Sequence, residues 1–225
     1  MKIFSTFCIA AMLTVSCSTI NKTAKYPNMV ADIDPFSIGS VNASFDQVFS
    51  TKLKVDEINV IFYPRENEVA LEFGMNLGRY RQFWNKEGRQ LFIEALNRYK
   101  GDFENQKLAN NFYRTRGAYG RFKGRFQWNP LSISTMSTTY RSIPVIDLGY
   151  RFSDNSPYFT ANQNAAREES RSNKDITESP VFTIHFNRAQ AEELTKLFDE
   201  TFLLSSVKGK EPVQTIDSYR DEYPK

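Results

Sequence analysis

The chain has 225 residues, with 29 basic and 26 acidic side chains and a formal net charge of +3. This balance argues against a dedicated nucleic-acid-binding protein, which usually carries a strong basic excess. The length fits one domain with terminal segments, and a domain of that size buries a stable core without a metal or a disulfide.

The first residues of the chain have the proportions of an export signal. Lys2 precedes residues 3–15, an uncharged and mostly apolar stretch that is shorter than the about 18 residues of a membrane-spanning helix. Ser16 and Cys17 follow and open a polar segment. A small residue before a cysteine at the end of such a stretch resembles the lipobox of bacterial lipoproteins. Thr14 stands where that motif usually has Leu, and relaxed versions of the motif occur in spirochaetes and some other bacteria.

The resemblance implies that residues 1–16 are a signal peptide and that Cys17 becomes a diacylated first residue. Two acyl chains hold a protein stably on a membrane, whereas one chain holds it only weakly. Cys8 would leave with the signal, and lipidation would account for the unpaired cysteine that remains. Residues 17–40 would be a flexible tether in the cell envelope, at the outer membrane on its periplasmic or surface side if the cell has two membranes. The alternative is an ordinary cleaved signal in which Cys17 is incidental.

A β-hairpin is predicted near the start of the domain. Residues 57–63 are rich in β-branched and aromatic side chains and end at Pro64, and residues 68–77 alternate apolar with polar side chains. Strict alternation is typical of a strand with one buried face, and the short turn between the segments favours a hairpin. Residues 41–49, just before it, fit either a short helix or a strand.

A helix is predicted over residues 86–104, with Asn85 as its N-cap and apolar side chains at spacings of three and four. Residues 112–128 return to alternation and predict one strand. The Ser/Thr-rich residues 131–139 predict a loop or an irregular edge.

The second half of the chain predicts three strands and a helix. Residues 140–152 and 157–167 form a second hairpin in this interpretation, and residues 181–186 form a further strand. Asn187 then begins a helix over residues 188–204 as part of a capping box.

The predicted element order is therefore β-β-α-β-β-β-β-α over a single domain at residues 41–204. Strands joined by hairpin-length turns and separated by helices favour an α+β fold. We expect an antiparallel sheet of five to six strands with two helices packed on one face. Residues 205–225 are polar and predict a disordered tail.

Basic side chains gather around the 112–128 segment. Alternate residues of a strand point to the same side, so their charges reinforce one another. Near a membrane such a strip contacts anionic head groups, at about 1 kcal/mol per basic residue. The more ordinary interpretation is a solvated sheet face with Glu72 and Asp147 as cross-strand partners. The strip comprises Arg114, Arg116, Arg121, Lys123 and Arg125.

Other candidate groups give weaker signals. His185 is the single histidine, and without a cysteine beside it the usual zinc site cannot form. Asp32 and Asp34 lack the further ligands of a calcium loop. Two converging carboxylates would suit a glycosidase, although acidic residues on turns are usually solvated. We expect no cofactor or metal. The carboxylates considered are Glu66, Glu68, Glu72, Asp147, Glu168 and Glu169.

The 19 Phe and 11 Tyr side chains allow two interpretations. They form a solid core, or they line an apolar pocket between sheet and helices. The leading hypothesis is a membrane-tethered envelope lipoprotein that acts as a non-enzymatic binding or interaction module for an envelope protein. The alternative is a carrier of a lipid or another apolar small ligand, and the third hypothesis is an envelope hydrolase.

Overall fold

The computed structural model describes residues 26–47, 50–75, 78–110, 115–129, 139–169 and 178–210. The helices in these ranges are α1 (Lys86–Glu104), α3 (Arg188–Phe198) and α4 (Glu200–Ser206). The strands in these ranges are β1 (Phe36–Gln47), β2 (Ser50–Tyr63), β3 (Glu68–Met75), β4 (Gly78–Trp84), β5 (Gly120–Lys123), β6 (Phe126–Asn129), β7 (Tyr140–Ser142), β8 (Val145–Ser153), β9 (Ser156–Gln163) and β10 (Phe182–Phe186).

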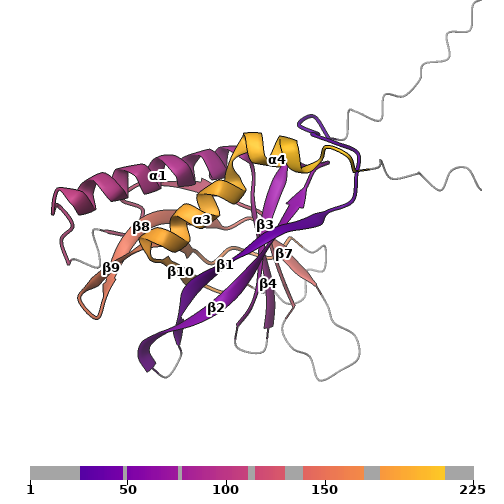
Figure 1. The fold of residues 1–225 in the computed structure, drawn as a ribbon. Coiled ribbons are helices and arrows are strands. Elements are labelled where there is room, and N and C mark those ends of the chain that lie inside the picture. The colour runs from indigo at the N-terminus through magenta and orange to yellow at the C-terminus, as the bar shows by residue number, and fades with distance from the viewer. Residues whose placement is uncertain are drawn as a thin grey trace, which may run out of the picture.

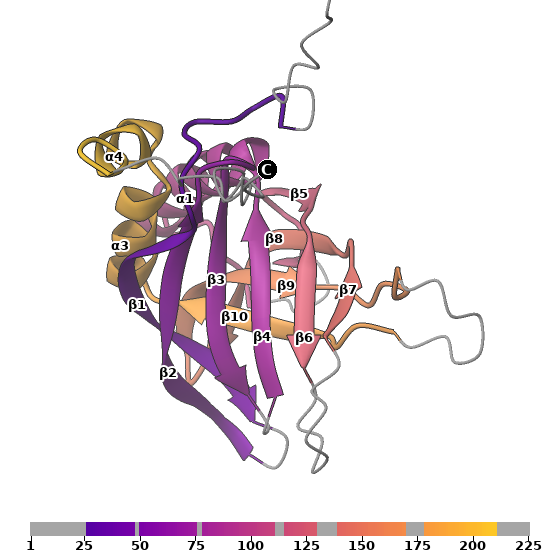
Figure 2. The same ribbon diagram turned by 90° about the vertical axis from the view of Figure 1, so that its right-hand side faces the viewer.

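All ten described strands belong to one antiparallel sheet, in the order β5-β8-β9-β10-β1-β2-β3-β4-β6-β7. The sheet curls into a half-barrel with the helices along one side (Figure 1). In Figure 2, β2, β3, β4 and β6 run upright in front of β8, β9 and β10, which cross behind them. The sheet therefore has a concave interior and a convex outer side.

The two ends of the sheet meet at the link between β5 and β6. The Gly124 N–H donates to the Pro144 carbonyl beside β8 (3.2 Å), and the Arg125 carbonyl accepts from the Phe83 N–H on β4 (2.8 Å). A Cβ on residue 124 would lie 2.6 Å from the Phe83 carbonyl oxygen and 2.9 Å from Ile146 Cδ1. Only glycine permits this approach, so Gly124 is the residue at which the β4 side and the β8 side of the curled sheet come together.

Helices α1 and α3 pack into one end of the concave interior. Helix α1 contacts β5 and β8, α3 contacts β1, β9 and β10, and the two helices contact each other. The ring of Phe92 on α1 lies edge-on to four other rings, with centroids 5.2 to 5.9 Å apart. These four are Trp84, Phe159, Phe186 and Phe198, and this close packing forms the helix-side half of the core.

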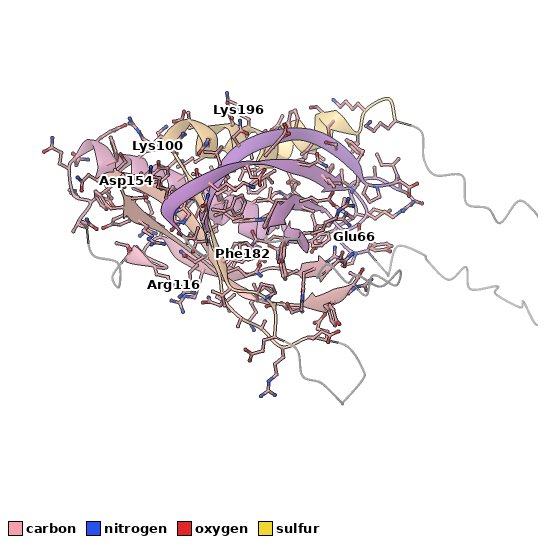
Figure 3. All side chains as sticks on the ribbon, turned by 90° about the horizontal axis from the view of Figure 1, so that it is seen from below. Glu66, Lys100, Arg116, Asp154, Phe182 and Lys196 are labelled. Carbon is pink, nitrogen blue, oxygen red and sulfur yellow. The ribbon has the colours of Figure 1, made fainter. Side chains whose placement is uncertain are left out.

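The rest of the interior is filled by rings from the sheet itself. Phe182 on β10 lies between the two halves of the sheet, as Figure 3 shows. Its ring centroid is 5.3 to 6.2 Å from those of Phe73, Tyr80 and Phe126, which come from the opposite strands β3, β4 and β6. The interior of the half-barrel is thus a continuous aromatic core.

The helix boundaries follow from capping side chains. Asn85 accepts a hydrogen bond from the Gly88 N–H at the start of α1, and Asn187 forms a full capping box with Gln190 at the start of α3. Asp199 has extended backbone and accepts a hydrogen bond from the Phe202 N–H, which begins α4. An aspartate is a strong N-cap, so it divides the predicted 188–204 helix into two.

The predicted fold was wrong in its size and layering. The sheet has ten described strands rather than five to six, and it curls around the helices rather than lying flat beneath two of them. The strand β4 was missed because its inward-facing residues include the polar Gln82, which interrupts the apolar alternation. The single strand predicted over residues 112–128 is divided into β5 and β6 at Gly124.

The terminal segments differ from the predicted boundaries or lie outside the described residues. Strand β1 begins at Phe36, inside the predicted tether. Outside the described residues lie the predicted signal peptide, Cys17, residues 211–225 of the predicted tail, and residues 131–138 of the predicted 131–139 loop. None of the described helices is long and apolar enough to cross a membrane.

Candidate functional site: a polar face on the outer side of the sheet

Polar side chains form an unbroken row across six neighbouring strands on the outer side of the sheet. Each residue of the row is the direct cross-strand partner of the next. The inward-facing residues of β2, such as Ile58 and Val60, are fully buried, so alternation places their polar neighbours outside. The row consists of Ser40, Asn59, Glu72, Arg81, Gln127 and Arg141.

A second set of polar residues lies two positions along the same strands. Glu57 on β2, Arg79 on β4 and Asn129 on β6 share the outer side with the row, and Arg79 pairs in register with Asn129. Ser37 joins them, because its hydroxyl donates to Asn59 Oδ1 (2.7 Å). We call the row and these four residues the polar face; Figure 2 shows β2, β3, β4 and β6, the strands that carry most of it, in front.

The polar face contains two hollows. The larger has a volume of about 610 Å³ and is lined by Ser37, Gly39, Ser40, Glu57, Asn59, Glu72, Phe73, Gly74 and Arg79. The smaller has a volume of about 180 Å³ and is lined by Glu72, Arg79, Tyr80, Arg81, Gln127, Trp128, Asn129 and Thr139. Both hollows include Glu72 and Arg79, so they form one trough that crosses the strands. Most of the lining residues have hydrogen-bonding side chains.

The charges of the polar face are unevenly distributed. Arg81 Nε donates to Glu72 Oε2 at 2.8 Å, so these two charges are paired. Arg79 and Arg141 are exposed and have no carboxylate partner among the described residues. The part of the face on β4 and β7 therefore carries unpaired positive charge, while Glu57 gives the β2 side a carboxylate.

A mixed aromatic and ionic cluster borders the polar face. The Arg125 guanidinium lies 3.7 Å from the centre of the Phe83 ring, and its Nε donates to Glu68 Oε2 at 3.2 Å. Tyr63 lies edge-on to Phe83 at 5.1 Å. Burial raises the pKa of the Tyr63 hydroxyl. These buried and half-buried residues border the polar face on the side of the β2–β3 turn.

The predicted basic strip does not form one continuous positive surface in the described residues. Arg116 and Arg121 both contact Asp147, at 3.4 Å each, and Arg121 is its cross-strand neighbour. Arg125 lies across the β5–β6 link and pairs with Glu68. Lys123 is exposed on the outer side of β5. Figure 3 shows Arg116 pointing away from the interior; Arg114 lies outside the described residues.

His185 lies on the outer side of the sheet but is completely covered by other residues. Its direct cross-strand partners are Ser44 and Thr160, and its Nε2 lies 3.3 Å from Asp46 Oδ2. Neither ring nitrogen has a hydrogen bond of normal geometry, and the residue is fully inaccessible. Burial would raise the pKa of Asp46, but its contacts with His185 and Arg151 lower it. A serine, a histidine and an aspartate thus lie together, but no hydrogen bond joins Ser44 to His185 and neither side chain reaches a cleft.

The carboxylates considered for glycosidase chemistry do not converge. Glu68, Glu72 and Asp147 each have an arginine partner. Asp32 and Asp34 both contact Arg65, at 2.6 and 3.1 Å. Within the described ranges, no group of three or more His, Cys, Asp or Glu side chains is placed to hold a metal. Arginine pairing therefore explains five of these acids, namely Asp32, Asp34, Glu68, Glu72 and Asp147.

Comparison with known proteins gives a family for the chain. A family model described as "Uncharacterised Treponema protein" matches residues 35–205. The chain belongs to this family. The match starts one residue before β1 and ends one residue before the end of α4, so it covers all the described strands and nearly all of the helices. Neither this description nor that of the relative below names an enzymatic activity.

A curated relative comes from Treponema pallidum (strain Nichols) and is described as "Uncharacterized protein". It is 23% identical over 129 residues, which are 57% of this chain and 45% of the relative. The chain thus matches less than half of the length of that relative. No solved structure matches the chain.

Sequence reasoning missed most of the polar face. Glu72 was considered only as an acid or as a partner for the basic strip, and Arg79 and Arg81 were not considered because β4 was not predicted. The available signal was the alternation of Arg79 and Arg81 with Tyr80 and Gln82 in residues 78–84. The pairing of β4 with β6 joins residues more than 40 positions apart in sequence, so the row itself had no local signal.

Proposed function

We propose that this member of the family is a lipid-anchored envelope protein whose domain is a non-enzymatic binding module. Its polar face is the binding surface. The observation that carries the proposal is the in-register row of polar side chains across six strands, which lies along a trough with a main hollow of about 610 Å³. Ligand sites are usually concave, with volumes of about 300–1,000 Å³, and carry polar groups that fix the orientation of the ligand.

The lipid anchor rests on the lipobox-like residues around Cys17. The family is described from Treponema, a spirochaete genus, and spirochaetes are among the bacteria in which relaxed lipoboxes occur. Strand β1 begins beside the last described residue, because Lys210 Nζ lies 4.1 Å from the Phe36 ring centre. The described chain before β1 packs against the β2–β3 turn, where the Val30 N–H donates to the Pro64 carbonyl and Arg65 pairs with Asp32. A tether would therefore leave the domain from the residues before Tyr26.

The polar trough gives the binding-module proposal more support than the apolar carrier. The larger hollow is lined by serine, glutamate, asparagine and arginine, and Phe73 is its one aromatic lining residue. Between sheet and helices, the rings of Phe92, Trp84 and Phe198 fill the space at centroid distances of 5.2 to 5.5 Å. An apolar ligand would have to displace these rings from a packed core.

The enzyme hypothesis has the least support. Its candidate groups are His185, which is fully inaccessible, and carboxylates that are paired with arginine. A general base must come within hydrogen-bonding reach of the proton that it removes. Among the described residues, none of these groups combines with a nucleophile at an open cleft.

Native mass spectrometry of the full chain, extracted from bacterial membranes in mild detergent, tests this proposal. The expected result is a diacylated N-terminus in the wild type, absent from Cys17→Ala, together with a hydrophilic bound mass that is lost on denaturation. An unlipidated wild-type chain would contradict the anchor. A bound lipid mass would support the carrier instead, and a lipidated chain without any bound mass would contradict the binding module.

A further inference from the structure

We propose that the polar face binds an extended acidic oligosaccharide along its trough, with carboxylate or sulfate groups at Arg79 and Arg81 in the trough and at Arg141 beside it on β7. This inference rests on the binding-module function and names its ligand class. It is carried by the arrangement of the arginines, by the chemistry of the lining, and by the complete pairing of the strands beneath.

The three arginines form a triangle on the outer side of the sheet. Arg79 and Arg81 are two residues apart on β4, so their backbone positions are separated by about 7 Å. Arg81 and Arg141 are both cross-strand partners of Gln127, which places them about 10 Å apart. Only Arg81 has a carboxylate partner in the described residues. The triangle therefore keeps an excess of positive charge that a ligand with several acidic groups can neutralise.

The guanidinium group suits an oxyanion because its planar N–H groups match carboxylate and sulfate geometry with two parallel bonds. Gln127 and Asn129 lie beside the arginines on β6 and line the smaller hollow. Each amide side chain both donates and accepts hydrogen bonds. This combination recognises acidic groups that are flanked by hydroxyl groups, as in an acidic sugar.

The remainder of the trough suits neutral hydroxyl groups. Ser37, Ser40, Asn59 and Glu57 supply donors and acceptors along the larger hollow. The six-strand row extends over about 24 Å at about 4.8 Å per strand, which is long enough for several linked sugar rings. Because the positive charge is confined to the β4 and β7 side, the trough also gives the bound chain a direction.

An extended peptide fits this surface less well. Peptides that bind to sheets usually add a strand at a free edge and pair through their backbone. Strands β2, β3, β4 and β6 each have a partner on both sides, so their backbone groups are already bonded. A ligand must therefore be recognised by side chains alone. A chain of sugars suits this, because its hydroxyl groups project along both of its sides and can reach the side chains of the trough.

Isothermal titration calorimetry of the full chain in detergent micelles tests the assignment. The probes are octasaccharides of heparin (sulfated) and hyaluronan (carboxylated), with an uncharged chitin hexasaccharide and a poly-glutamate peptide for comparison. We expect an acidic octasaccharide to bind more tightly than either comparison probe. Arg79→Gln and Arg141→Gln should each weaken that binding about tenfold or more, which corresponds to about 1.4 kcal/mol. Both side chains are exposed and have no carboxylate partner in the described part of the chain, so the variants should fold.

The matched control is Lys123→Gln, which removes one exposed positive charge from β5 in another part of the outer surface. It should change the dissociation constant less than about twofold. Equal weakening by Lys123→Gln would mean nonspecific charge attraction and would overturn the proposal, as would equal binding of poly-glutamate. If no saccharide binds while a hydrophilic mass still co-purifies with the protein, the sugar assignment fails and the binding-module function stands.

Discussion

The side-chain amide of Gln82 on β4 donates to Gln163 Oε1 on β9 at 3.0 Å, inside the half-barrel. Four strands separate β4 from β9 in the sheet order, so this bond spans the concave interior. Gln82 also accepts from Trp84 Nε1 (3.0 Å), and Gln163 donates to the Pro180 carbonyl (3.0 Å). Both glutamines are fully buried. This polar chain fixes how closely the two halves of the sheet approach.

The losses of stability in the two single Gln→Leu variants should add up to more than the loss in the double variant. Gln82→Leu leaves the Trp84 Nε1–H and the Gln163 Oε1 without partners in the core, which costs about 1–3 kcal/mol for each unsatisfied group. The double variant Gln82→Leu/Gln163→Leu removes both amides, so its loss should be smaller than the sum of the two single losses. Urea unfolding of the four proteins measures the coupling. Strictly additive losses would show that the bond does not join the two strands.

Gly124→Ala should destabilise the protein, because the new Cβ would approach the Phe83 carbonyl oxygen to 2.6 Å. Overpacking of this kind costs about 1–3 kcal/mol. Gly101→Ala is the matched control, since Gly101 lies within α1 and a Cβ there has no atom within 4 Å. Alanine in a helix should stabilise by about 0.5–1 kcal/mol. Thermal unfolding compares the two, and a neutral Gly124→Ala would contradict the closure of the sheet at this residue.

Glu200→Gln should destabilise the protein at neutral pH. Arg89 is almost fully buried, and it donates to Glu200, to the Asn67 carbonyl and to the Trp84 carbonyl. Burial lowers the pKa of Arg89, and Glu200 partly offsets this. Loss of the charged partner should cost about 1.5 kcal/mol. Glu192→Gln breaks the exposed pair with Lys100 and should cost less.

The effect of Glu200→Gln should disappear in acid. Burial alone would raise the pKa of Glu200, but its bonds to Lys86 and Arg89 lower it below the ordinary value. A carboxyl group with a lowered folded-state pKa contributes stability above the unfolded-state pKa of about 4.3, and loses it as the pH falls through the folded-state pKa. Urea midpoints of wild type and variant should therefore converge below about pH 4. A constant difference over the whole range would exclude the ion pair as the cause.

Local signals in the sequence predicted local structure well. The boundaries of α1 and its Asn85 cap were predicted because a cap and a four-residue spacing are both visible in the chain. The hairpins of β2 with β3 and of β8 with β9 were predicted for the same reason, since a short polar turn separates alternating segments. These features depend on residues that are neighbours in sequence.

The features that define the fold and the polar face depend on distant residues. Gly124 ends β5 because of atoms from Phe83 and Ile146, which no local pattern reveals. Arg81 faces outward beside Gln127 and Arg141 only because β4 pairs with β6 and β6 with β7. The sequence placed Arg125 in one strip with Arg121, whereas the β5–β6 link carries it to the other end of the sheet.

A substitution that fills the larger hollow is the most direct test of the central claim, which is that the polar face binds a ligand. Gly74 lines this hollow, and a Cβ there would come no closer than 3.8 Å to another atom, the Gly78 carbonyl oxygen, so Gly74→Trp should fill the trough without disturbing β3. Gly101→Trp makes the same change on α1. The measurement is native mass spectrometry of both full-length variants beside the wild type. We predict that the bound hydrophilic mass disappears from Gly74→Trp and persists in Gly101→Trp; its persistence in a folded Gly74→Trp protein would contradict binding at the polar face.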